Sequence, residues 1–69
     1  MIQDAILDYL EDNPGAEQWL VVQKIGEEYD VPAYKVVEMI EQLQRDGRIE
    51  AKDDADLRGM RQIQRCAVH

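Results

Sequence analysis

Two groups of polar residues could carry recognition chemistry in this chain. The first lies on the hydrophilic arc of a predicted helix that begins at Ala33, and the members nearest its start are Tyr34, Lys35 and Glu38. Side chains at such spacings share one face of a helix, where they can donate and accept hydrogen bonds. The alternative is that Tyr34 covers the edge of the core and the charged groups are only solvated.

The second group consists of three cations that follow this helix, Lys52, Arg58 and Arg61. Arg58 can place a guanidinium on a phosphate or in a minor groove, and Asp56, two residues earlier, can orient it. The alternative is an ion pair at the tip of a hairpin with no ligand, and an exposed pair of that kind contributes little stability.

The remaining reactive side chains suggest no catalytic or metal-binding set. Cys66 and His69 lie near the C-terminus without a third partner, and a single cysteine excludes an internal disulfide. The carboxylates fall on helix faces with no defined pair or pocket. We therefore expect no enzymatic activity, no metal and no cofactor.

The length of 69 residues predicts one domain over residues 1–69. A chain of this size buries roughly 60% of the surface that it exposes when unfolded, so most apolar residues must contribute to a single core. With no disulfide and no expected metal, stability must come from packing or from a partner chain.

The formal charge of −7 is concentrated in the first half of the chain. Residues 1–34 contain eight carboxylates against Lys24, whereas residues 35–69 contain seven groups of each sign. Counterion release by Lys and Arg supplies most nonspecific affinity for nucleic acids, so this balance argues against strong general attraction to DNA. An acidic face of this kind is typical of a solvated surface, of proteins from salt-loving cells, or of a surface that binds another protein.

No apolar run approaches the ~20 residues that a membrane-spanning helix needs. The N-terminus also lacks the basic and apolar regions of a signal peptide. We expect a soluble, cytoplasmic protein with no membrane partner.

The first helix is predicted from an apolar stripe at helical spacing: Ile2, Ala5, Ile6, Tyr9 and Leu10. Asn13-Pro14-Gly15 ends it, because proline cannot continue the hydrogen-bond ladder. The run Trp19–Val22 is either a very short strand or the entry to a second helix that ends at Tyr29. Trp19 and Tyr9 are expected in the core, and Gly26 is expected to permit a close approach between helices.

The third helix follows a tight turn at Asp30-Val31-Pro32 and ends at Gly47, which suits the C′ position. Its apolar arc on a helical wheel comprises Val36, Ile40, Leu43, Met39, Ala33 and Val37. The predicted core joins this arc to the first two helices and contains Ile6, Leu10, Ile25, Val36, Ile40 and Leu43.

A hairpin is predicted after the third helix. Arg48–Lys52 alternates like a strand with one wet face, and Asp53–Arg58 is expected at the hairpin tip. The return strand lies within Gly59–Arg65, but its register stays open because Met60 and Ile63 fall on opposite faces.

Several short motifs connect these elements to a known family. Between residues 16 and 64 they are Ile25-Gly26, Val31-Pro32, Val36-Val37, Leu43, Gly47, Ile49-Glu50 and Asp53-x-x-Asp56-x-Arg58-Gly59. In these motifs the chain resembles the winged helix-turn-helix superfamily. Its second half is most similar to the MarR-type regulators, whose wing carries Asp-x-x-Asp-x-Arg-Ala/Gly.

The resemblance implies an α+β fold, a small winged helix-turn-helix with three helices plus a β-hairpin wing. It also implies that Ala33, Tyr34, Lys35 and Glu38 enter the major groove of DNA. The chain departs from the family at two points. It lacks the long flanking helices through which MarR-type proteins dimerise, and it has Glu38 where that family often has a basic residue. A carboxylate is repelled by phosphates, although it can accept a hydrogen bond from the cytosine amino group.

The function expected from this resemblance is sequence-specific binding of double-stranded DNA by a small transcriptional regulator. One module covers little DNA, so a homodimer or a protein partner is also expected, with the first helix and the C-terminal tail as dimer surfaces. The alternative is an acidic winged helix that serves as a protein-protein interaction module in a replication or transcription complex.

Overall fold

The computed structural model describes residues 2–53 and 61–66 of the chain. In chain order, its elements are α1 (Ile2–Asp12), β1 (Ala16–Glu17), α2 (Gln18–Tyr29), α3 (Ala33–Arg45), β2 (Ile49–Asp53) and β3 (Arg61–Arg65). The described part of the chain thus combines three helices with a small antiparallel sheet, which confirms the predicted α+β class.

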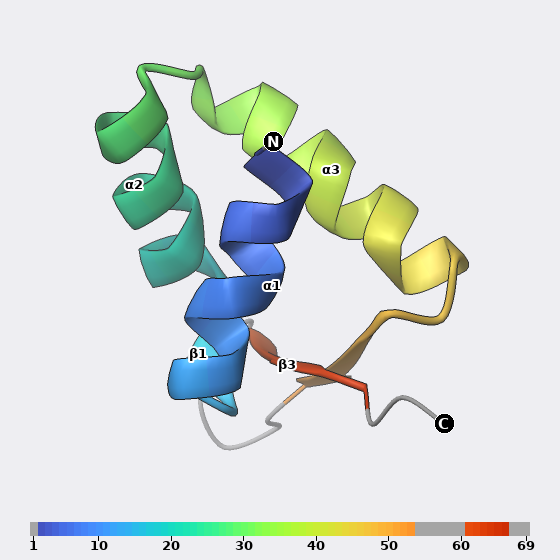
Figure 1. Cartoon of the computed structure of the whole chain (residues 1–69). Helices are drawn as coiled ribbons and strands as arrows, with labels where there is room; N and C mark the ends of the chain where they lie inside the picture. Colours follow the sequence, from blue (N-terminus) through green and yellow to red (C-terminus); the bar gives the residue numbers. More distant parts are fainter. Residues whose placement is uncertain (1, 54–60, 67–69) are drawn as a thin grey trace.

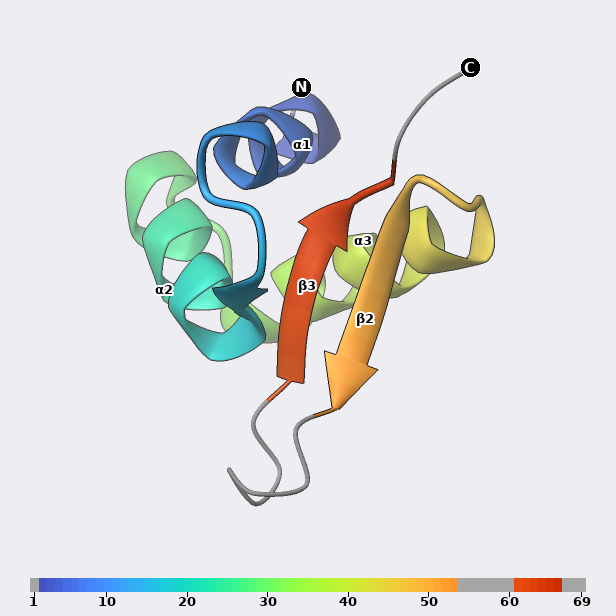
Figure 2. The same ribbon diagram turned by 90° about the horizontal axis from the view of Figure 1, so that it is seen from below.

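The three helices pack against one another, and the sheet closes the lower side of this bundle. Figure 1 shows α1 in front, between α2 and α3, with the strands below them. Seen from below in Figure 2, β3 lies between β1 and β2, and α3 runs behind the β2–β3 pair. Two neighbours in the sheet, β1 and β3, are therefore separated in sequence by α2, α3 and β2.

The end of α1 follows the predicted stop signal. The backbone N–H and the side-chain amide of Asn13 both donate to the Tyr9 carbonyl, each at 2.9 Å. Gly15 then adopts φ +77°, a left-handed conformation that glycine tolerates without a steric penalty. The chain turns here and enters β1.

A very short strand was one of the two alternatives for Trp19–Val22, but the first strand lies earlier, at Ala16–Glu17. Glu17 caps α2, because its side-chain carboxylate accepts the Leu20 N–H at 3.0 Å. Trp19–Val22 therefore forms the first turns of α2, the second of the two alternatives. Val21 and Val22 face the core, whereas Trp19 is exposed, so its expected place among the core aromatics was wrong.

Gly26 permits a close approach, although its neighbour is a turn rather than a second helix. A Cβ built on Gly26 would lie 2.9 Å from the carbonyl oxygen of Val31. The Val31 N–H also donates to the Gly26 carbonyl at 3.0 Å, and Asp30 between them is left-handed with φ 55°. The short connection between α2 and α3 thus folds directly onto α2.

The third helix ends as predicted. Gly47 has φ +78° and donates to Gln44 at 3.1 Å, while the Arg48 N–H donates to the Leu43 carbonyl at 2.9 Å. This pair of bonds is the Schellman arrangement at a helix C-terminus. It directs the chain from α3 straight into β2.

The hairpin strands pair in a defined register, from Ile49 opposite Arg65 to Asp53 opposite Arg61. Ile63 lies opposite both Ala16 on β1 and Ala51 on β2. The expected tip, Asp53–Arg58, falls almost entirely in residues 54–60 and so lies outside the described residues, as do residues 67–69 of the tail.

An exposed ion pair joins the sheet to the first helix. The Arg65 guanidinium lies 2.5 Å from the Glu11 carboxylate. Both side chains are accessible to solvent, so we expect only a small contribution to stability from this pair.

The core draws on all three helices and on the two longer strands. All six residues that the sequence assigned to it are buried together. The complete cluster comprises Ile6, Leu7, Leu10, Val21, Val22, Ile25, Val36, Ile40, Leu43, Ile49 and Ile63. Ala33, which the helical wheel put on the apolar arc, is exposed, because it is the first residue of α3 and lies beyond the edge of this cluster.

Replacing Ile40 by Ala should remove about 2–5 kcal/mol from the free energy of unfolding, since the side chain is fully buried. A domain of this size has only about 3–10 kcal/mol in total, so the denaturant midpoint should fall sharply. Glu41→Ala, at the exposed neighbouring position, is the control and should change stability by less than about 0.5 kcal/mol. An unchanged midpoint in Ile40→Ala would mean that α3 packs through a different face.

Replacing Gly26 by Ala should also destabilise the domain, by about 1–3 kcal/mol, because the new methyl group would overlap a backbone carbonyl. Helix propensity alone predicts the opposite, a gain of about 1 kcal/mol. Chemical denaturation of Gly26→Ala, with the exposed Gln23→Ala as control, separates steric overlap from helix propensity. A Gly26→Ala variant that is more stable than the parent would show that the turn can move aside.

Candidate nucleic-acid interface

The outward face of α3 is the first candidate surface. The helix starts after Pro32, which has extended backbone angles, and Lys35 and Val36 donate their N–H groups to the Pro32 carbonyl. Val36, Ile40 and Leu43 are buried beneath the helix. The opposite side of the helix must therefore face solvent.

All four residues predicted on this face are exposed: Ala33, Tyr34, Lys35 and Glu38. Tyr34 has 69% of its surface accessible, so it does not cover the edge of the core. The exposed face of α3 thus presents a phenol, an ammonium and a carboxylate within its first two turns.

The same face continues toward the C-terminal end of α3 with polar residues that the sequence analysis did not include in the site. The Arg45 guanidinium donates to the side-chain Oε1 of Gln42 at 3.3 Å, and the Gln42 side-chain amide donates to the Asp46 carboxylate at 3.1 Å. Four charged side chains lie on the exposed part of α3. The cations Lys35 and Arg45 balance the carboxylates of Glu38 and Glu41, so this part of the helix has no net charge.

One flank of this face borders the first helix. An open hollow of about 310 Å³ is lined by Lys35, Glu38, Met39, Gln42, Arg45 and, from α1, Gln3. Gln3 lines this hollow only because α1 packs across α3. The spacing of residues within α3 therefore could not have predicted its presence there.

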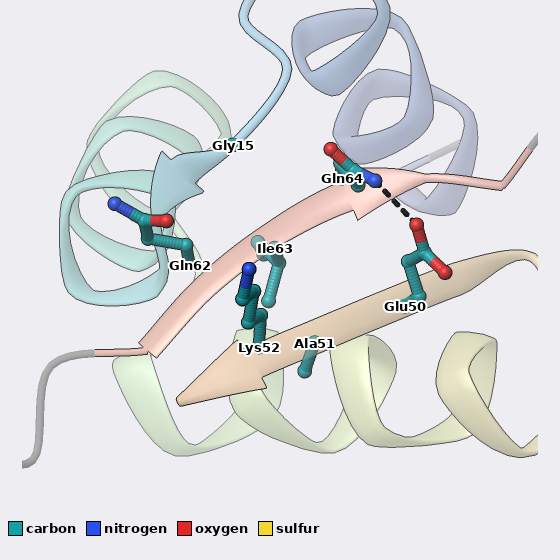
Figure 3. A pocket seen from close by; sticks show the side chains of 7 residues that line it. All are labelled: Gly15, Glu50, Ala51, Lys52, Gln62, Ile63 and Gln64. Atoms are coloured by element: carbon teal, nitrogen blue, oxygen red, sulfur yellow. Dashed lines mark hydrogen bonds between the residues drawn. The ribbon is translucent and has the colours of Figure 1, made fainter. Parts of the chain in front are cut away.

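Lys52 lies on a different side of the molecule from the α3 residues. It is exposed on β2, in register with Gln62, whereas its neighbour Ala51 packs against the core. Figure 3 shows Lys52 on the side of the sheet that faces away from α3. There it borders an open hollow of about 520 Å³ lined by Gly15, Glu50, Ala51, Lys52, Gln62, Ile63 and Gln64, in which the Gln64 amide donates to Glu50.

Arg61 is half-buried at the first position of β3, opposite Asp53. By strand alternation it leaves the same face of β3 as the buried Ile63, so it and Lys52 leave opposite faces of the hairpin. Arg58 lies outside the described residues. The structure therefore brings together the four α3 residues but does not gather the described cations of the hairpin on one surface.

The described residues offer few other chemical centres. Within 2–53 and 61–66, no three His, Cys, Asp or Glu side chains are grouped so that they could hold a metal ion. Cys66 is a half-buried free thiol whose backbone N–H donates to the Arg48 carbonyl. Over the same residues, no helix has the length and apolar character needed to cross a bilayer.

Comparison of the chain with protein-family models, with curated proteins and with solved structures produced no match.

Proposed function

We propose that this chain binds double-stranded DNA as a small winged helix-turn-helix regulator, with α3 as the recognition helix. The observation that carries the proposal is the exposed start of α3, where Tyr34, Lys35 and Glu38 stand in solvent while the opposite face is fixed in the core. A helix of 13 residues is about 20 Å long and fits the major groove of B-DNA.

The order of the elements supports a winged helix-turn-helix arrangement. A three-residue turn, Asp30–Pro32, joins α2 to α3, and α3 leads directly into the β2–β3 pair. In DNA-binding domains of this kind, the second helix of the turn lies in the major groove. The hairpin after it would then reach the adjacent backbone.

The chemistry of the α3 face suits base recognition better than phosphate binding. A lysine ammonium can donate to guanine O6 or N7, and a glutamate can accept from the cytosine amino group. Lys35 and Glu38 lie three residues apart on the same helix, close enough to contact neighbouring base pairs. The lack of net charge on this face implies that one domain binds weakly, so the regulator would act as a dimer or with a partner protein.

A second candidate function is an acidic winged helix that docks onto another protein in a replication or transcription complex. The charge of −7, with eight carboxylates against Lys24 in residues 1–34, favours it. Fluorescence anisotropy with mixed-sequence duplex DNA at low and high salt separates the two functions. Affinity that falls steeply with salt supports DNA binding, and no measurable binding at low salt would favour protein docking.

If DNA is the ligand, Lys35 and Arg58 should have unequal roles. Lys35→Ala should change the preference among DNA sequences, because this side chain lies early on the recognition helix. Arg58→Ala should weaken binding to all sequences alike and reduce the slope of log affinity against log salt by about one. Competition binding with a duplex library measures both the preference among sequences and the overall affinity. If both variants lose the same affinity for every sequence, Lys35 does not take part in base recognition.

A substitution at Glu38 tests whether the negative charge of this side chain opposes DNA binding at the proposed interface. Glu38→Gln removes a negative charge that would repel phosphates and should tighten binding to nonspecific duplex, by about 0.2–1 kcal/mol for an exposed group. Asp8→Asn on the exposed side of α1 changes the net charge equally and is the matched control. Equal effects of the two substitutions on affinity would mean that DNA does not approach α3.

A further inference from the structure

Two large apolar side chains stand in solvent at the start of α2. Trp19 has 53% and Leu20 57% of its surface accessible, whereas the next two residues, Val21 and Val22, are buried. With 3.6 residues per turn, Gln23 lies between Trp19 and Leu20 one turn further along the same outer face. These three residues, which we call the α2 patch, are not needed for the core.

The α2 patch is held in place by the elements around it. Glu17 ends β1, pairs with Gln62 on the central strand, and accepts the Leu20 N–H with its carboxylate. The first turn of α2 is therefore anchored to the sheet and capped. A partner would meet a preformed surface, which reduces the ordering cost of binding.

Trp19 and Leu20 are adjacent in the chain, so they form a contiguous exposed apolar area, and such areas can mark an interaction surface. The chain must bury most of its apolar residues in one core, and tryptophan is among the residues enriched where proteins bind other proteins. An acidic surface adapted to high salt would account for the carboxylates, but it would not account for a tryptophan and a leucine in water.

The charge around the α2 patch selects the kind of partner. From its cap to its last turn, α2 carries Glu17, Glu27, Glu28 and Asp30 against Lys24. The exposed side of the neighbouring α1 adds Asp4, Asp8 and Asp12, while its fourth carboxylate, Glu11, is already paired with Arg65. A second copy of this chain would bring the same carboxylates, and DNA would bring phosphates, so both are repelled from this side.

We propose that the α2 patch docks a Lys/Arg-rich amphipathic helix of another protein. The apolar stripe of that helix would cover Trp19 and Leu20, and its cations would face Glu27 and the other carboxylates of α2. In Figure 1, α2 and α3 flank α1 on opposite sides. The proposal does not depend on DNA binding by α3.

The single tryptophan of the 69-residue chain allows a direct test with this chain as it stands. The probe is a synthetic helix of about 18 residues, or five turns, with a leucine stripe and lysine at its other positions. A second peptide with glutamate in place of every lysine is the comparison. The lysine peptide should shift Trp19 emission to shorter wavelength with saturation, and the glutamate peptide should bind at least about tenfold more weakly.

Two pairs of variants separate docking at the α2 patch from general attraction to an acidic protein. Leu20→Ala should weaken binding of the lysine peptide about tenfold, whereas Tyr34→Ala, at an even more exposed aromatic on α3, should leave that binding unchanged. Glu27→Gln should weaken it more than Asp8→Asn, although both remove one negative charge. Circular dichroism confirms that each variant is folded.

Three results would overturn the proposal: equal affinity for both peptides, binding unaffected by Leu20→Ala, or a blue shift that grows with protein concentration alone as the chain dimerises. Lys35→Ala keeps the test separate from DNA binding, because it should alter duplex binding and leave the peptide titration unchanged.

Discussion

The burial of Ile63 connects the sheet to the helices. This residue lies in the middle of the central strand β3, with no surface exposed to solvent, between Ala16 on β1 and Ala51 on β2. The two alanines present little side chain to the core, so the helices can approach the central isoleucine closely. Because β1 and β2 are far apart in sequence, this row of three residues joins the segment before α2 to the strand that follows α3.

Once the sheet is fixed in this way, the outward face of α3 has little freedom. The core holds Val36, Ile40 and Leu43, and the Schellman bonds after Leu43 attach the end of the helix to β2. Tyr34 and Glu38 then have to face solvent. The proposed recognition face is thus the unused side of a helix whose other side holds the domain together, and its neutral charge limits what it can bind strongly.

Local signals in the sequence predicted much of this structure. The position of β1 was missed because it depends on a contact that is distant in sequence. The Asn13-Pro14-Gly15 stop and the end of α3 at Gly47 depend on nearby backbone conformation, which residue type reveals. The two-residue strand β1 has too few positions for any periodicity and exists because β3 pairs with it.

The misplacement of Trp19 has a local cause, whereas part of the candidate site depends on how the elements pack. Trp19 belongs to an apolar run, but the cap at Glu17 starts the helix early and turns this side chain outward. The helical wheel is local information, and it placed Tyr34, Lys35 and Glu38 correctly on the exposed side of α3, whereas Ala33 was assigned to the apolar arc and is exposed. The alternation of Ile49 and Ala51 could have shown that Lys52 leaves the other face of its strand, whereas the place of Gln3 beside α3 required the packed fold.

DNA binding through the start of α3 can be tested directly by NMR. Duplex DNA is added to the isotopically labelled protein while the chemical shifts of the backbone amides are followed. Our account predicts that the largest changes fall at the start of α3, on Tyr34, Lys35 and Glu38, and that the outer face of α2 is little affected. Changes confined to Trp19, Leu20 and their neighbours, with the α3 amides unmoved, would contradict it.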